Sequence, residues 1–338
     1  MLSWNLFIIG CLLIALSMVD VLWSTVSTRG GGPVAMRVAS TCWWSLRWLS
    51  SVFPNSRIQE FNSVAVLVLT FLAWVLPMWV GWTLIFSAPV DIIIDLGSEE
   101  PAGLVDRAYF AGMIFLTLGT GDFIATTPGW RLLTIAAAIN GLAVITLTIT
   151  YLISVLSAAI DKRHLGASVL ALGKSPRQML LNGWDERGFA PLEDALRPLG
   201  RELMLHAEQH LAYPVLQYFH ATEDRVSLLE SVAVLEDATT LLSEAVEPQA
   251  RASEVTICAL RRAVDHYLRR VALAQAEDVI NPPPLPDLDE ARSRGLPLVD
   301  DAAIKRAFDQ RQQTRRALLG LITASGRQWP TKGATGVF

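Results

Sequence analysis

Thr117-Leu118-Gly119-Thr120-Gly121-Asp122-Phe123 is the stretch of sequence that decides the fold of this 338-residue chain. It lies between two long apolar segments, at residues 63–86 and 132–159. Each is long enough for a helix that crosses a membrane, because a hydrocarbon core of roughly 30 Å requires about 20 apolar residues. Irregular backbone at that depth survives only where protein buries it or where it faces water, since lipid offers no hydrogen bonds. A Gly-x-Gly segment in this place therefore indicates a conduit rather than an ordinary turn.

The composition divides the chain near residue 160. Residues 1–160 contain six arginines, no lysine and eight acidic residues, whereas residues 161–338 contain 22 basic and 24 acidic residues. We therefore expect a membrane-embedded first half and a soluble second half. The balanced charge of the second half gives no reason to expect a nucleic-acid partner. The three cysteines, at positions 11, 42 and 258, have the spacing of neither a disulfide framework nor a metal site.

Three segments are predicted to span a lipid bilayer, at residues 2–23, 63–86 and 132–159. Arginines occupy the loop between the first two, Lys162 and Arg163 follow the third, and the loop before the third is acidic. Short cytoplasmic loops are enriched in basic residues. The charges thus predict a multi-pass protein of the cell (inner) membrane, with its N-terminus outside and its C-terminal half in the cytoplasm. Asp20, near the cytoplasmic end of the first span, is expected to reach the interface or to pair with a loop arginine.

Residues 34–53 leave two alternatives open. Tryptophans at positions 43, 44 and 48 are interspersed with Arg37 and Arg47, which favours an amphipathic helix that lies at the cytoplasmic interface. A fourth crossing is the alternative, although it would place arginines inside the bilayer. The arginines of this region are too widely spaced for a voltage-sensing helix.

The segment before the glycines is predicted to enter the membrane and stop partway. Residues 104–116 are apolar and helical in length but too short to cross. The C-terminal end of such a helix carries the negative pole of its dipole, which favours a cation. Gly119 and Gly121 permit a left-handed backbone that directs successive carbonyls toward one axis. Thr117 adds a hydroxyl oxygen, and Asp122 concentrates cations at the outer mouth.

The run YFAGMIFLTLGTGDFIATTPGWRL, at residues 109–132, resembles the pore module of the two-transmembrane potassium channel family, whose filter reads TVGYGD. The resemblance covers about residues 61–160. It implies K⁺ as the permeant ion and a homotetramer, since one filter per chain cannot surround an ion. The selectivity filter would comprise Thr117, Leu118, Gly119, Thr120, Gly121 and Asp122.

The resemblance also assigns roles on the third span. Gly141 falls where the family places the hinge of its inner helix. The register makes Leu142, Ile145, Ile149, Thr150 and Ile153 the candidates for lining the pore and closing the gate. A ring of isoleucines can close a path by dewetting. Ordinary helix packing or lipid contact is the alternative reading of this stripe.

The chain departs from the family pattern at the filter itself. Thr120 replaces a Tyr or Phe that braces the filter from behind, so Tyr109 and Phe110 are expected to lack that ring partner. Met113 stands where some members carry a carboxylate that pairs with the filter aspartate. These departures leave a non-selective cation channel open, and also a non-conducting membrane sensor or assembly protein with a degenerate pore. A transporter subunit is disfavoured, because such proteins carry four pore loops in one chain.

The cytoplasmic half is predicted to be all-helical. Its helices are expected at about residues 191–220, 224–246, 249–277 and 300–324, with prolines at 198 and 214 dividing the first. Residues 281–286, NPPPLP, are expected to be a linker that separates the last helix from the rest. Glu202, His206 and His210 could share a helix face and bind a metal, but a polar stripe is the simpler reading. The basic face formed by Arg261, Arg262, Arg269 and Arg270 is expected to be solvated or salt-bridged rather than to meet the membrane.

The sequence thus predicts an all-α membrane protein with three regions. Residues 1–60 form an anchor and an interfacial helix, residues 61–160 a tetrameric pore-loop domain, and residues 161–338 an α-helical cytoplasmic domain. No nucleophile–base pair or convergent carboxylates indicate an enzyme. No cofactor, no metal other than the permeant cation, and no cytoplasmic ligand or partner is indicated.

Overall fold

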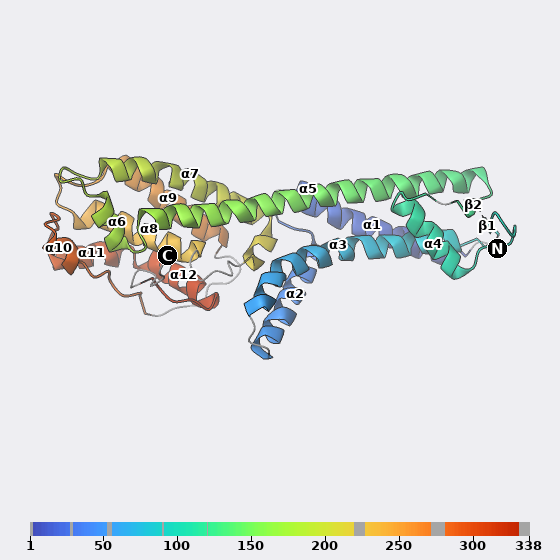
Figure 1. Ribbon diagram of the computed structural model, residues 1–338, viewed down its shortest axis with the longest axis horizontal. Coiled ribbons are helices and arrows are strands. Elements are labelled where there is room, and N and C mark those ends of the chain that lie inside the picture. The colour runs from blue at the N-terminus through green and yellow to red at the C-terminus, as the bar shows by residue number, and fades with distance from the viewer. Residues whose placement is uncertain are drawn as a thin grey trace. The chain divides into compact units, whose positions relative to one another are not determined.

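The computed structural model describes residues 3–27, 30–52, 56–89, 91–119, 121–219, 227–271 and 281–330. These residues fall into two compact units. One lies within Met1–Leu156 and Ala212–Phe219, and the other within Ser157–Leu211 and His220–Phe338. Both consist almost entirely of helices, which confirms the predicted all-α class (Figure 1).

The first unit is built from long apolar helices. Its elements are α1 (Trp4–Val26), α2 (Pro33–Val52), α3 (Ser56–Ser87), α4 (Leu104–Phe115) and the first part of α5 (Pro128–Leu172). Among the described residues, α1, α5 and the Val64–Ser87 part of α3 are long and apolar enough to cross a membrane, which confirms the predicted spans. The helix predicted at residues 34–53 is present as α2 and lacks the properties of a span. The side chains of Trp43, Arg47 and Trp48 lie outside the described ones.

Asp20 joins α1 to the start of α2 and to the middle of α3. Its Oδ1 accepts a hydrogen bond from the Val34 amide at 2.7 Å, and its Oδ2 accepts one from the Ala35 amide at 3.1 Å. Carboxylates favour this position because the first amides of a helix have no partner within it. Oδ2 also accepts a bond from the Trp74 indole at 2.8 Å. The carboxylate is buried, so the expectation that it reaches the membrane interface is wrong.

A small antiparallel sheet closes the outer end of this unit beside the start of α5 (Figure 1). It pairs β1 (Ile93–Asp95) with β2 (Phe123–Ala125), so that Ile94 faces Ile124. The sequence analysis did not predict these strands, because three residues are too few to display the alternation of a strand. The sheet matters because β2 begins immediately after Asp122.

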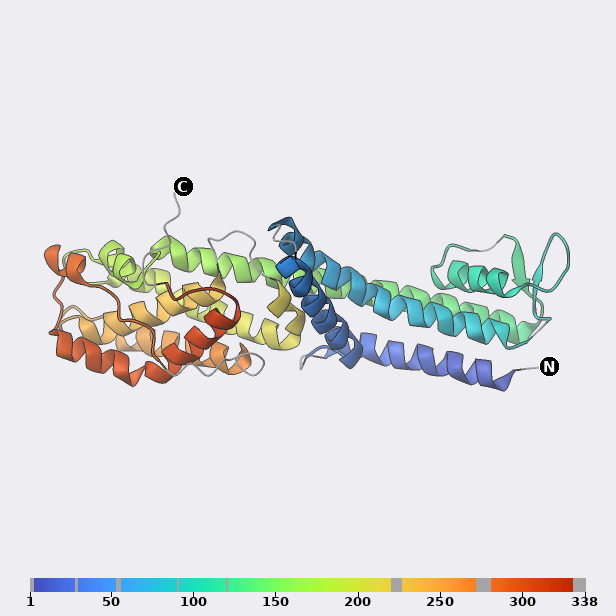
Figure 2. The same ribbon diagram turned by 90° about the horizontal axis from the view of Figure 1, so that it is seen from below.

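The second unit is a helical bundle (Figure 2). It comprises the end of α5, α6 (Pro176–Gly183), α7 (Ala190–Ala212), α8 (Leu228–Thr240), α9 (Glu254–Val271), α10 (Asp289–Ser293), α11 (Asp301–Gln310) and α12 (Gln312–Ala324). α8 continues as a π-helical turn at Leu241–Ala245 and packs against α6, α9, α11 and α12. Its residues from Ser231 to Thr240 are all buried, so α8 forms the centre of the bundle.

Several predicted boundaries differ from the observed ones. Pro198 lies inside α7 and does not divide it, whereas Pro214 begins a separate 3₁₀ helix, η1 (Pro214–Tyr218). The last predicted helix is two helices, which meet at Arg311. Helices α6 and α10 were not predicted. The expected start near residue 224 and the expected end near residue 277 lie outside the described residues.

The proline-rich segment at residues 281–286 is not a free linker. Arg315 of α12 donates hydrogen bonds to the Pro283 carbonyl at 3.2 Å and to the Pro284 carbonyl at 2.7 Å. A proline carbonyl is a hydrogen-bond acceptor, and the guanidinium supplies several N–H donors to such groups. The expectation that this segment separates the last helices from the bundle is therefore wrong, because Arg315 attaches it to the bundle.

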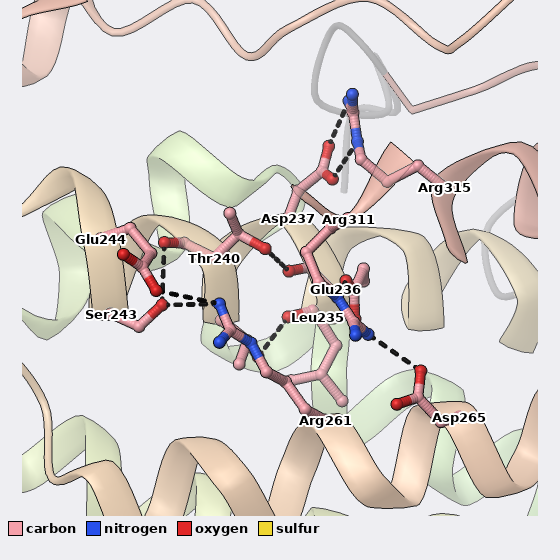
Figure 3. A network of polar contacts seen from close by, with 11 residues as sticks. Leu235, Glu236, Asp237, Thr240, Ser243, Glu244, Arg261, Asp265, Arg311 and Arg315 are labelled. Atoms are coloured by element: carbon pink, nitrogen blue, oxygen red, sulfur yellow. Dashed lines mark hydrogen bonds and ion pairs between the residues drawn. The ribbon is translucent and has the colours of Figure 1, made fainter. Parts of the chain in front are cut away.

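Arginine–carboxylate pairs cross the interior of the bundle (Figure 3). Arg311 donates two bonds to Glu236, at 2.6 and 3.1 Å, and one to Asp265 at 3.0 Å. Arg315 donates two bonds to Asp237, at 2.8 and 3.1 Å. Both carboxylates belong to α8 and are buried, so each needs a bidentate partner to offset the loss of hydration.

Candidate functional site

Helix α4 has the length and the start expected of a re-entrant helix. Its 12 residues would rise only about 18 Å, too little to cross a hydrocarbon core. At its beginning the Asp106 carboxylate accepts a bond from the Gly103 amide at 3.1 Å. At its other end the Phe115 carbonyl lies against Gly141 of α5. Gly141 comes 13 residues after the start of α5, or about 20 Å along it, so α4 ends well inside membrane depth.

Arg107 anchors the outer end of α4. Its guanidinium is buried and donates to the carbonyls of Ala102 at 2.9 Å, Pro89 at 2.8 Å and Ser87 at 3.3 Å. Ser87 is the last residue of α3, so this arginine ties α4 to the end of the preceding span. The sequence analysis assigned Arg107 only to a loop charge balance, and nothing in its position signalled an anchor.

The backbone after α4 turns sharply at the predicted filter. Thr117 has φ 58° and Gly119 has φ 80°, both in the left-handed region. The amides of Leu118 and Gly119 both donate to the Met113 carbonyl, at 2.8 and 3.3 Å. Left-handed backbone was expected at Gly119 and Gly121. It occurs at Gly119 and Thr117, and Gly121 does not have a positive φ.

The filter segment faces open space in the single chain. A Cβ atom at Gly119 or at Gly121 would meet nothing within 4 Å, and the Leu118 side chain is 67% exposed. Thr120, whose lack of a bracing ring motivated the alternative functions, lies outside the described residues. An exposed turn at membrane depth cannot remain bare in lipid, because its amides and carbonyls would lack partners.

The backbone that leaves the predicted filter is bonded to the loop between α3 and α4. The Asp122 carbonyl accepts a bond from the Leu96 amide at 2.8 Å, and β2 then pairs with β1. Arg131 of α5 donates to the Ala125 carbonyl at 3.0 Å. The Asp122 carboxylate is exposed, and the described residues give it no ion-pair partner. It therefore stands free at the position expected of an outer-mouth acid.

The aromatic residues of α4 find ring partners other than position 120. Tyr109 packs edge-on against Phe123, with ring centroids 6.0 Å apart, and Phe110 packs edge-on against Phe86 at 5.1 Å. Such edge-to-face pairs add to the free energy gained from burial. Thr120 offers these rings no aromatic partner, as expected, and the filter exit and α3 each supply one instead.

Helix α5 has a buried and an open face within its own unit. Gly141, Val144, Tyr151 and Val155 are buried against the neighbouring helices. Among the predicted pore-lining residues, Ile145 is partly exposed. The other four are exposed, and they are Leu142, Ile149, Thr150 and Ile153. The predicted set therefore occupies the face that the chain leaves uncovered.

Hydroxyl groups flank this open face. The hydroxyls of Thr146, Thr150 and Ser154 each donate to the carbonyl four residues earlier, at 2.8, 2.9 and 2.9 Å. Each proton is thereby committed to the helix backbone, and the oxygen lone pairs remain available. The stripe is thus an acceptor surface, which suits a hydrated cation.

A re-entrant helix, a left-handed turn at its end and a following span with an uncovered face define a pore-loop channel module. Residues 66–158 match a family model described as an ion channel. YdjJ, an uncharacterized membrane protein of Bacillus subtilis strain 168, is 32% identical over 326 residues, which cover 96% of this chain and 95% of that protein. No solved structure matches the chain. The chain belongs to the pore-loop ion channel family.

The predicted metal alternative in the second unit gains no support from the geometry. No group of three or more His, Cys, Asp or Glu side chains within the described ranges is arranged to hold a metal ion. His206 is buried beside Tyr267, and its Nδ1 lies 3.4 Å from the Gln209 side chain, so the simpler expectation of a polar stripe on the surface is wrong at this residue. Burial and the positive Lys162 lower the pKa of His206 to about 4, so its imidazole is neutral near pH 7.

The basic face predicted on α9 is partly salt-bridged. Arg261 lies 3.8 Å from Glu244 and also donates to the Ser243 hydroxyl, and Arg270 lies 3.2 Å from Glu208. Arg262 and Arg269 are exposed. The pairing with acids of the same unit agrees with the expectation of a solvated and salt-bridged face.

Proposed function

We propose that this channel protein conducts potassium ions through a homotetrameric filter in the cell membrane. The observation that carries the proposal is the left-handed turn at Thr117 and Gly119, which follows directly from the C-terminal end of a helix that stops at membrane depth. Carbonyl oxygens in such a turn can replace the hydration shell of a cation. The negative end of the α4 dipole and the exposed Asp122 carboxylate add a field of the same sign.

The exposed filter supports assembly around an axis. One copy supplies carbonyls on one side of an ion only, and a closed cyclic arrangement supplies the others. Four copies follow from the resemblance to the potassium channel pore. The open face of α5 would then line the cavity below the filter, with Ile149 and Ile153 as gate candidates and Gly141 as the predicted hinge. The basic loops support an external N-terminus and a cytoplasmic C-terminal half.

A segment from the C-terminal half supports gating by that half. Residues 212–219 belong to the first unit, and η1 packs there against α2 and α3 with Leu216 fully buried. Tyr213 lies edge-on to Tyr151 of α5, with ring centroids 6.0 Å apart. A change in the cytoplasmic helices that moves this segment would therefore reach the inner helix. No cofactor or cytoplasmic ligand is part of the proposal.

Purified protein in planar bilayers tests the proposal. With K⁺ on one side and Na⁺ on the other, we expect unitary currents with a reversal potential displaced toward that of K⁺. Gly119→Ala should abolish the current, because φ 80° strains any residue with a Cβ. Gly129→Ala is the matched control, since a Cβ there meets nothing within 4 Å.

The two remaining alternatives predict different results. A reversal potential near zero under these conditions would favour a non-selective cation channel. No unitary current under varied voltage, pH and Ca²⁺ would favour a non-conducting membrane sensor or assembly protein.

A further inference from the structure

The closest backbone approach involving any described glycine joins the pore helix to the inner helix. A Cβ atom at Gly141 would lie 1.6 Å from the Phe115 carbonyl oxygen, 2.6 Å from its carbon and 3.2 Å from its Cα. The obstacle is backbone, so no side-chain rotation could relieve it. α5 is continuous through this position, from Pro128 to Leu172. Gly141 therefore has an evident use in this structure that is distinct from bending.

The end of α4 is connected directly to the filter. Phe115 is its last residue, and the Thr117 amide donates to the Ile114 carbonyl at 2.9 Å. The amides of Leu118 and Gly119 donate to Met113, one turn earlier. A shift of the last turn of α4 would therefore carry the first filter residues with it.

Trp79 of α3 holds the same helix from a second side. Its indole donates to the Ala108 carbonyl at 2.9 Å. A Cβ at Gly112 would lie 3.0 Å from the indole nitrogen and 3.5 Å from Cε2, so the ring lies flush with α4. A side chain at position 112 would therefore require the indole to shift by a few tenths of an ångström.

A third contact joins α3 to α5. Trp82, one turn after Trp79 on α3, donates to the Asn140 side chain at 3.0 Å. Asn140 immediately precedes Gly141, so α3 and α5 are joined next to the point where α4 meets α5. The three helices thereby fix one another around the end of the pore helix.

We propose that Gly141 and Trp79 are positioning residues that set the location of the filter and thereby its ion selectivity. This inference rests on the proposed function. It assigns the bracing of the filter to α3 and α5, which hold the last turns of α4 from behind. The filter of this chain would then need no aromatic side chain at position 120 to keep its carbonyls in place.

Three variants in planar bilayers test the inference, with permeability ratio, unitary conductance and open fraction all measured. Gly141→Ala should change the K⁺/Na⁺ permeability ratio by about threefold or more, because the Phe115 carbonyl must move. Trp79→Phe keeps an aromatic ring and removes the donor, so it should shift the ratio in the same direction by less. Gly129→Ala should leave the ratio unchanged.

The readouts separate positioning from hinge motion. A Gly141→Ala channel with altered open fraction but unchanged permeability ratio and conductance would overturn the inference and favour the hinge. If Gly141→Ala does not fold, the K⁺/Na⁺ permeability ratio of Trp79→Phe tests the inference in its place. An unchanged permeability ratio in Trp79→Phe overturns the inference.

A measurement that requires no ionic current tests the inference independently of the proposed function. With the native cysteines replaced by serine, Leu118→Cys places a thiol on the exposed side of the filter. The rate of its modification by a polar thiol reagent should change when Gly141→Ala is added and not when Gly129→Ala is added. An equal rate in all three proteins refutes the positioning role. Absence of wild-type current would instead refute conduction.

Discussion

The two units use opposite means to join helices through polar side chains. In the first unit, which contains the spans, tryptophan indoles supply three of the links between helices and reach Asp20, the Ala108 carbonyl and Asn140, beside the amides that bond Asp20 and the carbonyls that bond Arg107. In the second unit, arginines meet buried carboxylates, as at Arg315 and Asp237. A neutral indole loses little when it leaves water, whereas an ion pair loses much and must regain it by geometry. We therefore expect the first unit to tolerate the loss of one tryptophan link better than the second unit tolerates the loss of one partner of a buried ion pair.

The largest expected effect comes from breaking the buried ion pair between Arg315 and Asp237 in the second unit. Arg315→Ala would leave the Asp237 carboxylate, whose side chain is 2% exposed, without its bidentate partner. It would also remove the two bonds to the proline carbonyls. We expect a loss of about 3–5 kcal/mol in unfolding free energy. Thermal and denaturant unfolding of the detergent-solubilised full-length protein would measure it.

Two further variants test the cause of that loss of unfolding free energy. Adding Asp237→Asn to Arg315→Ala removes the uncompensated charge and should recover part of the stability. Arg262→Ala, at an exposed position of α9, should change unfolding by less than about 0.5 kcal/mol. Equal stability of the Arg315 and Arg262 variants would show that the buried pair is not what distinguishes the second unit.

A smaller effect is expected on acidification of the same unit. The pKa of His206 is lowered to about 4 by burial and by Lys162, whereas an unfolded histidine titrates near its ordinary value of 6.5. Below pH 6.5 His206 binds a proton in the unfolded chain but stays neutral in the folded chain. The free energy of unfolding therefore falls as the pH falls toward 4. The expected loss between pH 7 and pH 5 is about 2 kcal/mol. Melting temperatures at the two pH values would measure it.

His206→Gln isolates this contribution, because glutamine does not titrate. The variant should lose less stability than the wild type between pH 7 and pH 5. His164→Gln serves as the control, since the His164 side chain is 69% exposed. Identical pH dependence in the wild type and the His206 variant would contradict the assignment to His206.

The sequence was informative where patterns are long and failed where contacts are specific. Apolar length predicted the three spans and α4, because membrane thickness imposes that length on any sequence. The filter position was predicted from two glycines and stays a prediction. The contacts of Arg107 and Asp20 could not be predicted from the sequence, since each depends on which carbonyl or amide lies nearby in space. The pairing of Arg315 with Asp237 joins residues 78 positions apart, which no local pattern records.

The same limit explains the roles that were only half predicted. Gly141 was recognised by its register, but its contact with the Phe115 carbonyl requires the packing of two helices. Pro198 was expected to break a helix, and yet it lies within α7. Intrinsic preference is a weak guide when tertiary packing acts on the same residues.

The smallest effect on stability is expected at the open face of the first unit. Ile149 is 52% exposed within the chain, so Ile149→Asn should change unfolding in detergent by less than about 1 kcal/mol. Its expected effect is functional, because an amide in a narrow apolar ring keeps water in the path and raises the open fraction in single-channel records. Val144→Asn, at a buried position five residues earlier on α5, should instead destabilise the fold. Unchanged open fraction in the Ile149 variant would assign this face to helix or lipid contact. A large loss of stability in the Ile149 variant would show that the first unit does not tolerate a single substitution better than the second unit does.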